Sequence, residues 1–425
     1  MALQPALELD SIAVEVTAPG WRARLMTLGA LLILADAFDR ILIAVVGDNA
    51  LLLPGLPYSR LLLLPVFTAA GWLLAGHLRS AANNVRAAWP LWPVLGLSFL
   101  SVAWSAVPTT TLLWAIALLG VSAFGVALAV RFSPQDQAAL VAATGAIIAL
   151  GSIMWVLLLP GRYGPWSGAW EGLYVHKNLL GRIVALGVVA AAVDLAIGHR
   201  RPLALLAFLL CFGVTVASRS QASLLDIVIA VAAAMLLLGA RRWPRQATVI
   251  LAGGAAAIGV ALVLLLATPA GLALLTRSYT FNGRTVIWKL VTASAMQKPW
   301  FGHGYGAFWP SAPGLNVAAA FYVPINHAHN GFLDVFAELG VAGVVLVCVP
   351  LAVIGFAACR QALRSRDDGA IWPAVYLVFF VASNAAESGL LRHKIYWALY
   401  AAAACHVASN RSGRAVRADH APVRG

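Results

Sequence analysis

Charged residues are scarce in this sequence, and their scarcity decides its class. Only 11% of the 425 residues are charged and 61% are hydrophobic, whereas a typical globular domain is about 25% charged. Apolar runs of about 20 residues, long enough to cross a bilayer, recur from end to end. These runs are continuous rather than alternating, which argues against a transmembrane β-barrel. We therefore predict an all-α, polytopic membrane protein.

Cysteines are also few, and all lie in or beside apolar runs, so they predict neither a disulfide framework nor a metal site. The first 20 residues carry acidic side chains and precede an apolar run too long for a cleavable signal peptide. The net charge of +13 is typical of cytoplasmic loops rich in Lys and Arg. With no nucleic-acid-binding motif in sight, we expect no nucleic-acid partner.

Hydropathy predicts about twelve transmembrane spans. A large outward-facing loop, 268–329, separates the ninth span from the tenth. Residues 1–24 and 410–425 are expected to be cytoplasmic tails, and 25–409 the membrane domain. The expected spans are 25–46, 61–78, 89–106, 110–130, 138–159, 179–197, 203–217, 222–239, 247–267, 330–357, 371–386 and 394–409.

The first span is unusual because it carries Asp36, Asp39 and Arg40 near its middle. In one continuous helix, Asp36 and Arg40 share a face and can pair. The alternative is a broken or re-entrant first segment.

The distribution of Lys and Arg predicts the orientation. With both termini inside, most basic residues fall in the inner segments and the 268–329 loop lies outside. The remaining cations lie where topology does not require them and need another explanation. They include Arg40, Lys177, Arg182, Arg219, Arg284, Arg392 and Lys394.

The outer loop contains no Asp or Glu, so the loop alone cannot build a carboxylate site for Mg²⁺ or Mn²⁺. Its run from Gly302 to Gly306 follows no predicted strand, so we interpret the glycines as permitting tight turns rather than holding a nucleotide. Apolar residues within 285–297 predict a short interfacial helix that begins near Arg284 and is ended by Pro299.

The outer cations suggest an anionic ligand. Arg219 lies in a very short outer turn, where it can contact lipid headgroups or grip an anion with its planar fork. Together with Arg284 and Lys177 it would form a cationic cluster at headgroup depth. Such a cluster suits a lipid-linked diphosphate and can stabilise the charge that grows on a diphosphate leaving group.

His329 is the candidate general base, because a neutral imidazole can accept a hydroxyl proton near pH 7; the alternative is a helix-entry residue. Either Asp334 or Glu338 can orient a base or pair with an outer Arg, since carboxylates within membrane spans are costly. His327 and His329 invite a zinc site, but no third ligand lies at suitable spacing nearby, so no metal is predicted.

Six segments, taken in order, resemble the O-antigen ligase and O-antigen polymerase superfamily, which includes exopolysaccharide polymerases. Glu387-Ser388 followed by Tyr396-Trp397 resembles the exopolysaccharide-polymerase branch. The resemblance covers roughly residues 90–400. The six segments are Ser101–Ser105 with Pro108 and Thr111, His176–Gly181, Ser218–Ser220, Gly283–Trp288, Pro299–Gly306, and His327–Leu333 with Glu338–Gly340 and Gly343.

The resemblance implies a glycosyltransferase of the bacterial inner membrane with a periplasmic active site and cytoplasmic termini. It would move a glycan from undecaprenyl diphosphate to an acceptor hydroxyl, with neither metal nor cofactor. The leading assignment is a ligase with lipid A core as acceptor, and the alternative is a polymerase with a glycan acceptor. Membrane lipids are the other expected partners.

The resemblance also assigns roles to residues. His329 would be the base, and Arg219 and Arg284 would hold the diphosphate, with Lys177 a weaker assignment. The supporting residues would be Asn330, His176, His327 and Glu387. A second alternative, a transporter of polysaccharide or lipid-linked sugar, predicts inverted repeats and charges in mid-membrane. We find no internal repeat, and only Asp36, Asp39 and Arg40 fit such charges.

Overall fold

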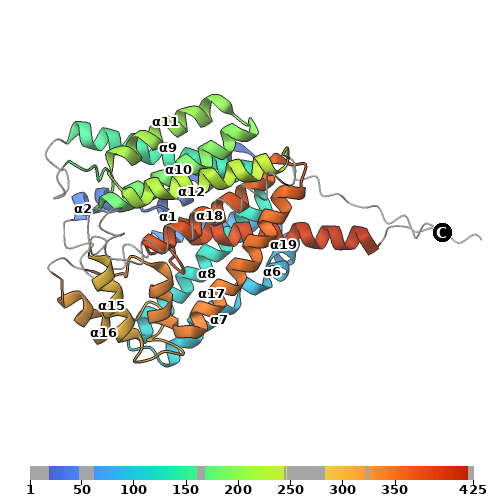
Figure 1. Cartoon of the computed structure of the whole chain (residues 1–425). Coiled ribbons are helices and arrows are strands. Elements are labelled where there is room, and N and C mark those ends of the chain that lie inside the picture. The colour runs from blue at the N-terminus through green and yellow to red at the C-terminus, as the bar shows by residue number, and fades with distance from the viewer. Residues whose placement is uncertain are drawn as a thin grey trace, which may run out of the picture.

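The computed structural model describes residues 19–46, 62–159, 168–243, 246, 283–321 and 325–419. Within these ranges every regular element is a helix, which confirms the all-α prediction (Figure 1). Short 3₁₀ turns at Trp89–Leu91, Ser101–Ala103 and Asp368–Ala370 adjoin the α-helices. The α-helices are α1 Trp21–Leu34, α2 Asp39–Val46, α5 Leu63–Leu74, α6 Leu78–Ala87, α7 Pro93–Leu100, α8 Pro108–Arg131, α9 Pro134–Leu158, α10 Lys177–Ile197, α11 Arg201–Ala217, α12 Gln221–Ala240, α15 Arg284–Ala295, α16 Ala312–Ala319, α17 Gly331–Arg364, α18 Ile371–Ala386 and α19 Ile395–Asp419.

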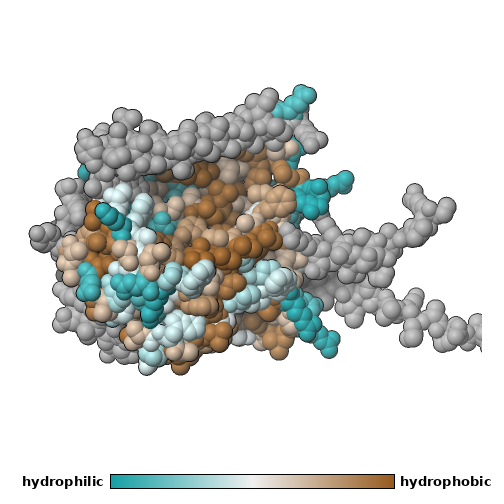
Figure 2. All heavy atoms as spheres, turned by 60° about the horizontal axis from the view of Figure 1, so that its bottom comes forward, coloured by the Kyte–Doolittle hydropathy of each residue, from teal (hydrophilic) through white to brown (hydrophobic). Residues whose placement is uncertain are grey.

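Among the described residues, 6 helices are long and apolar enough to cross a membrane, or up to 7 if α6 and the bent segment 89–103 form one span. The shorter apolar helices α5, α11 and α19 occupy three further expected spans. The expected ninth span, 247–267, and the loop residues 268–282 lie outside the described residues. Figure 2 shows hydrophobic residues across the middle of one face, with hydrophilic residues toward its ends. The chain is thus a multi-pass membrane protein.

Helix α10 forms the centre of the bundle and packs against α9, α11, α12 and α18. Small residues allow its close approach to α9, because a Cβ at Gly187 would lie only 3.0 Å from the Gly145 Cα. The start of α10 lies beside the end of α18, because Asn178 donates to Glu387 and Arg182 donates to Ser383. The candidate active site forms at this junction.

The first expected span is broken. Helix α1 ends at Leu34, and Asp36 adopts a left-handed backbone with φ 58°. The predicted pairing of Asp36 with Arg40 is therefore wrong, because it requires a continuous helix. Asp36 instead pairs with Lys394, and the Arg40 Nη2 lies 3.1 Å from the Glu171 Oε2. The alternative of a broken first segment is correct.

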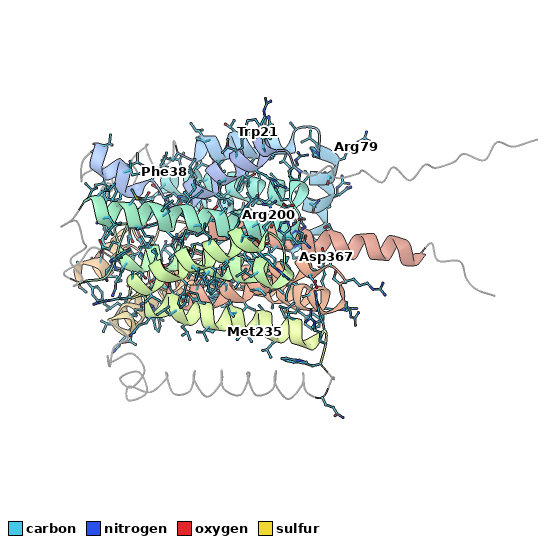
Figure 3. All side chains as sticks on the ribbon, turned by 90° about the horizontal axis from the view of Figure 1, so that it is seen from above. Trp21, Phe38, Arg79, Arg200, Met235 and Asp367 are labelled. Atoms are coloured by element: carbon cyan, nitrogen blue, oxygen red, sulfur yellow. The ribbon has the colours of Figure 1, made fainter. Side chains whose placement is uncertain are left out.

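Basic residues of the predicted inner segments meet at the end of the bundle away from α15 and α16. The guanidinium groups of Arg24 and Arg200 lie 3.3 and 3.4 Å from Asp136, and Arg241 lies 2.6 Å from Asp368. Figure 3 shows Asp367 at this end, with Phe38 toward the opposite end. The inner segments therefore share one end, as predicted, and which side of the membrane that end faces remains a prediction.

Helices α15 and α16 cap the start of α17 over a small apolar core that includes Ile287, Val291, Phe308 and Ala337. Helix α15 confirms the short helix predicted from residues 285–297, although it ends at Ala295. The backbone of this cap lies close to the membrane domain, where each amide needs a hydrogen-bond partner.

The glycine run supplies those partners by docking into a break in α17. Gly340 interrupts the helix with φ 64° and ψ −162°. The Gly304 amide donates to the Glu338 carbonyl at 2.8 Å, and the Val341 amide donates to the Pro299 carbonyl at 2.8 Å. A Cβ on Gly340 would lie 2.4 Å from the backbone of Trp300, so only glycine fits there. The predicted tight turns at these glycines are confirmed, with φ 65° at Gly302 and 104° at Gly304.

Candidate active site

The Glu387 carboxylate is the point where distant parts of the chain converge. It follows α18 directly, and its side chain is only 7% exposed. Its Oε1 accepts hydrogen bonds from the Arg284 Nη2 at 2.7 Å and the Asn178 Nδ2 at 3.2 Å. Its Oε2 accepts a hydrogen bond from the His329 Nδ1 at 3.0 Å and lies 3.6 Å from the His327 Nε2. One carboxylate therefore joins α10, α15 and the segment before α17.

The backbone around His329 is fixed on both sides. Asn330 caps the start of α17 with its side-chain oxygen. The Ala328 amide donates to the Asp334 Oδ1 at 3.0 Å, and the Ala328 carbonyl accepts from the Trp288 Nε1 at 2.9 Å. His329 itself has a left-handed backbone with φ 50°. These contacts hold a sparsely populated conformation, which often marks functional sites.

The electrostatics favour a neutral imidazole beside an ionised carboxylate. Burial lowers the pKa of His329 below its usual value, and the hydrogen bond to Glu387 only partly offsets this. Burial by itself would raise the pKa of Glu387, but His327, His329 and Arg284 together hold it well below its usual range. Because Glu387 accepts a hydrogen bond from the Nδ1–H of His329, the Nε2 of the neutral ring keeps its lone pair and can act as a base.

Asp334 also links the segments of His329 and Glu387, the hydrogen-bonded pair that we call the dyad. Its Oδ1 accepts from the Ala328 amide and from the Trp309 Nε1 at 2.9 Å, and its Oδ2 accepts from the Ser388 hydroxyl. It thus touches the residue before His329 and the residue after Glu387. The prediction that Asp334 or Glu338 pairs with an outer Arg is confirmed for both, since both bind Arg392. The base itself is oriented by Glu387 instead.

Five of the cations that topology left unexplained bind acidic side chains, hydroxyls or carbonyls among the described residues. Arg40, Arg284, Arg392 and Lys394 each pair with an acidic side chain. Arg182 donates to the Ser388 carbonyl at 3.1 Å and to the Ser383 Oγ at 3.0 Å, and its guanidinium lies 4.1 Å from the centre of the Tyr396 ring. Buried charges need such partners. The contacts of Arg182 also anchor the segment that carries Glu387 to α10, which carries Asn178.

The remaining predicted residues lie on neighbouring segments. His176 caps α10, with its Nδ1 accepting from the Asn178 amide at 3.2 Å, and burial lowers its pKa. Lys177 is the first residue of α10. Arg219 has φ 50° and lies against Gly168, where a Cβ would be 3.4 Å from its Nη1. The diphosphate-binding role of Lys177 and Arg219 stays a prediction.

The structure thus brings together Arg284, His327, His329, Asn330 and Glu387 from the predicted set. Sequence reasoning missed the roles of Asn178, Arg182, Ser388 and Arg392. Asn178 follows Lys177 in one of the recognised segments, and Arg182 and Arg392 belong to the unexplained cations. The recognised segment and the unexplained cations marked these residues in the sequence, but neither feature indicated which side chain each would contact.

A candidate cation site includes both members of the dyad. His327, His329 and Glu387 each offer one ligand atom, and these atoms lie within 4.8 Å of one another. The third ligand that the sequence lacked near the histidines comes from the end of α18. Residues for a metal are therefore present, although Arg284 already shares the carboxylate.

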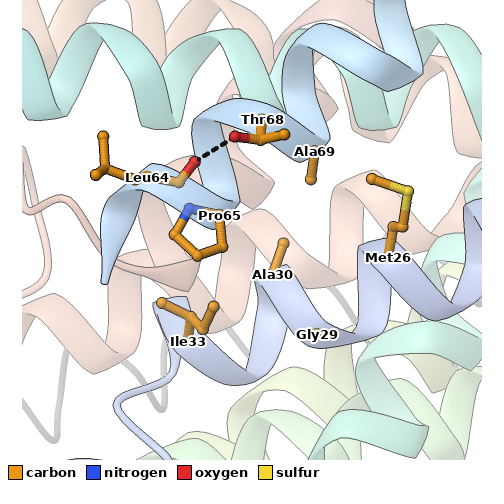
Figure 4. Close-up of a pocket in the computed structure, with 8 residues that line it drawn as sticks. All are labelled: Met26, Gly29, Ala30, Ile33, Leu64, Pro65, Thr68 and Ala69. Carbon is orange, nitrogen blue, oxygen red and sulfur yellow. Dashed lines mark hydrogen bonds between the residues drawn. The ribbon is translucent and has the colours of Figure 1, made fainter. Parts of the chain in front are cut away.

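A separate groove between α1 and α5 is apolar (Figure 4). Its one hydroxyl, on Thr68, donates to the Leu64 carbonyl at 2.9 Å. Its lining residues include no titratable side chain, so it offers no charged group to hold a diphosphate. They are Met26, Gly29, Ala30, Ile33, Leu64, Pro65, Thr68 and Ala69.

Comparison with known proteins adds a family to this geometry. Residues 206–348 match the family model described as O-antigen ligase. A segment of 96 residues is 29% identical to the exopolysaccharide production protein ExoQ of Rhizobium meliloti (strain 1021). Both matches support the O-antigen ligase and polymerase superfamily.

The resemblance inferred from the motifs is thereby confirmed. The family match contains Arg219, Arg284, His327 and His329 but ends before Glu387. The match to ExoQ covers 21% of this chain and 22% of the relative. The activity of the whole chain is therefore a matter for proposal.

Proposed function

We propose that this protein is a membrane glycosyltransferase that moves a glycan from an undecaprenyl-diphosphate donor to an acceptor hydroxyl. The observation that carries the proposal is the contact of Glu387 with both His329 and Arg284, at 3.0 and 2.7 Å. One carboxylate thus holds a base and an anion-binding group beside each other. Glycosyl transfer from a diphosphate to a hydroxyl uses both groups, the base for the hydroxyl proton and the cation for the leaving diphosphate.

His329 acts as the general base. Its Nε2 takes the proton of the acceptor hydroxyl while that oxygen attacks the anomeric carbon of the donor. Glu387 holds the Nδ1 proton, which fixes the tautomer and stabilises the imidazolium that forms. The proton then passes from Nε2 to solvent, and the dyad returns to its starting state.

Arg284 stabilises the leaving group. The bond between the anomeric carbon and the diphosphate oxygen breaks, and the lipid diphosphate takes the bonding electron pair. A guanidinium has five N–H donors, so it can hold Glu387 and a phosphate oxygen together. Arg219 and Lys177, on adjacent segments, add positive charge. Charge stabilisation by these cations supplies what a divalent metal would otherwise provide, so we propose metal-independent transfer.

Two acceptors fit this chemistry. The description of the matching family model supports a ligase, whose acceptor is lipid A core. The likeness to ExoQ supports a second candidate, a polymerase that extends a glycan. For either we place the protein in the bacterial inner membrane, with cytoplasmic termini and a periplasmic site. The transporter alternative weakens, because Asp36 and Arg40 are engaged in ion pairs with Lys394 and Glu171.

A reconstituted transfer assay tests the proposal. Purified protein receives an undecaprenyl-diphosphate oligosaccharide and lipid A core, with His329→Ala beside wild type. His303→Gln is the matched control, because His303 is buried in the same cap but contacts the Ser294 carbonyl. Glycan on lipid A core, lost only in His329→Ala, supports a ligase, and longer lipid-linked glycan supports a polymerase. Folded wild type that transfers nothing with several donors refutes both.

Chelation tests the metal-independent chemistry separately. We expect full transfer after EDTA treatment and removal of the chelator, since the cations that hold the diphosphate are side chains. A rate that collapses on chelation and returns with one added metal would contradict this part of the proposal.

A further inference from the structure

The geometry around Glu387 matches the requirements of zinc. The Glu387 Oε2 lies 3.0 Å from the His329 Nδ1 and 3.6 Å from the His327 Nε2. In a tetrahedral zinc site with bonds of about 2.0–2.1 Å, ligand atoms lie about 3.3–3.4 Å apart. These two separations fall on either side of that value, and the two imidazole nitrogens lie no more than 4.8 Å apart. Side-chain rotations that close this last separation would place all three atoms at bonding distance.

The surroundings orient these three atoms toward one another. The His327 Nδ1 lies 2.7 Å from the Asn326 Oδ1. In the tautomer with its proton on Nδ1, which zinc binding would select, Nδ1 donates to Asn326 and the Nε2 lone pair faces Glu387. The contact of His327 with Glu387 is longer than an ordinary N–H···O hydrogen bond. Arg284 and Asn178 occupy the Oε1 of Glu387, so its Oε2 points to the histidines. Metal-binding histidines and carboxylates are usually held by such outer hydrogen bonds.

We propose that Zn²⁺ binds reversibly to His327 Nε2, His329 Nδ1 and Glu387 Oε2, with water as a fourth ligand, and inhibits transfer. Two imidazoles and one carboxylate favour zinc over Mg²⁺ or Ca²⁺, which prefer all-oxygen sites. The binding half of this inference stands on the three ligands alone. The inhibitory half rests on the proposed function.

Inhibition follows from the tautomer of His329. Zinc takes the lone pair of Nδ1, so the single N–H proton of the neutral ring must move through solvent from Nδ1 to Nε2, with no net release. The proton then occupies Nε2, the atom that must accept the proton of the acceptor hydroxyl. The same metal replaces the hydrogen bond between His329 and Glu387. Bound zinc thus disables the base without requiring any change in the helices.

Metal binding is measured first, on full-length protein in detergent without a polyhistidine tag. Co²⁺ serves as the spectroscopic probe of tetrahedral coordination, and Zn²⁺ is titrated to displace it. We expect one zinc per chain and a loss of affinity of about ten-fold or more in His327→Ala and in Glu387→Gln. His303→Gln is the control and should bind as wild type does. Wild type that binds no zinc, or His327→Ala that binds equally tightly, overturns the inference.

Transfer is measured next across a zinc titration, with each variant compared to its own zinc-free rate. The zinc concentration for half-inhibition should rise about ten-fold or more in His327→Ala. A wild type that transfers glycan but is indifferent to zinc overturns the inhibitory half alone. A folded wild type that binds zinc but transfers nothing refutes the proposed function and leaves the metal site standing. Zinc that restores a rate lost on chelation shows a required metal and overturns inhibition.

Discussion

Replacing Asp334 with alanine removes the side chain that ties together the two halves of the proposed catalytic dyad. Asp334 is 1% exposed, and its Oδ1 accepts from the Ala328 amide and the Trp309 indole at 3.0 and 2.9 Å. Alanine leaves both donors buried without this acceptor. An unsatisfied buried donor costs about 1–3 kcal/mol, so the two together cost about 2–6 kcal/mol if neither finds a new partner.

The effect on catalysis should exceed the effect on donor binding. Ala328 precedes His329, so a loosened Ala328 displaces the imidazole, and a misplacement of about 1 Å can lower a rate about 100-fold. Arg284 keeps its contact with Glu387 at 2.7 Å, so the KM for the donor should change little. Asp334→Asn should stay within about ten-fold of wild type, because its amide oxygen still accepts and its NH₂ can donate to Ser388.

Steady-state transfer and thermal unfolding in detergent check both expectations. Glu338→Gln is the matched control. Glu338 lies on the same helix as Asp334 and binds the same Arg392 at 2.8 Å, whereas the bond from the Ala328 amide goes to Asp334. We expect Glu338→Gln to keep its kcat far better than Asp334→Ala. A wild-type kcat in a folded Asp334→Ala protein would refute the positioning role. Equal losses in the Asn and Ala variants would assign the effect to the charge of Asp334 rather than its hydrogen bonds.

Three further outcomes follow from the same geometry. Arg284→Lys should fold but lose about 100- to 1000-fold in kcat, because Lys lacks the bidentate fork; a near-normal rate would discard the diphosphate role. The acid limb of the rate should lie below pH 6.5, since burial lowers the pKa of the His329 base, and Glu387→Gln should move it lower by removing a bond that raises that pKa; a limb above pH 6.5 would contradict this. Gly340→Ala should lower the unfolding temperature, because its φ of 64° and ψ of −162° cost about 1–3 kcal/mol for a side-chain-bearing residue; an unchanged melting curve would argue against the docked break in α17.

The sequence determined the class of the protein and most of its spans. In a bilayer every backbone amide needs an internal partner, so a long apolar run has little choice but to form a helix. Local signals located α15 and the glycine turns, because a proline such as Pro299 ends a helix and the glycines from Gly302 to Gly306 permit tight turns. The motifs also selected His329, Arg284 and Glu387 as members of one site.

Only the tertiary structure decided which of these residues meet. His329 and Glu387 lie 58 positions apart, Arg284 and Glu387 lie 103 apart, and Asn178 and Glu387 lie 209 apart. Asp334, closer to His329 in sequence, was an equally reasonable partner until the fold placed it beneath the dyad. The sequence left the break at Asp36 as one of two alternatives, and it gave no signal for the pairing of Asp36 with Lys394. The physical reason is that hydropathy specifies which segments enter the membrane, whereas the packing of α10 against α18 specifies which helix ends face each other.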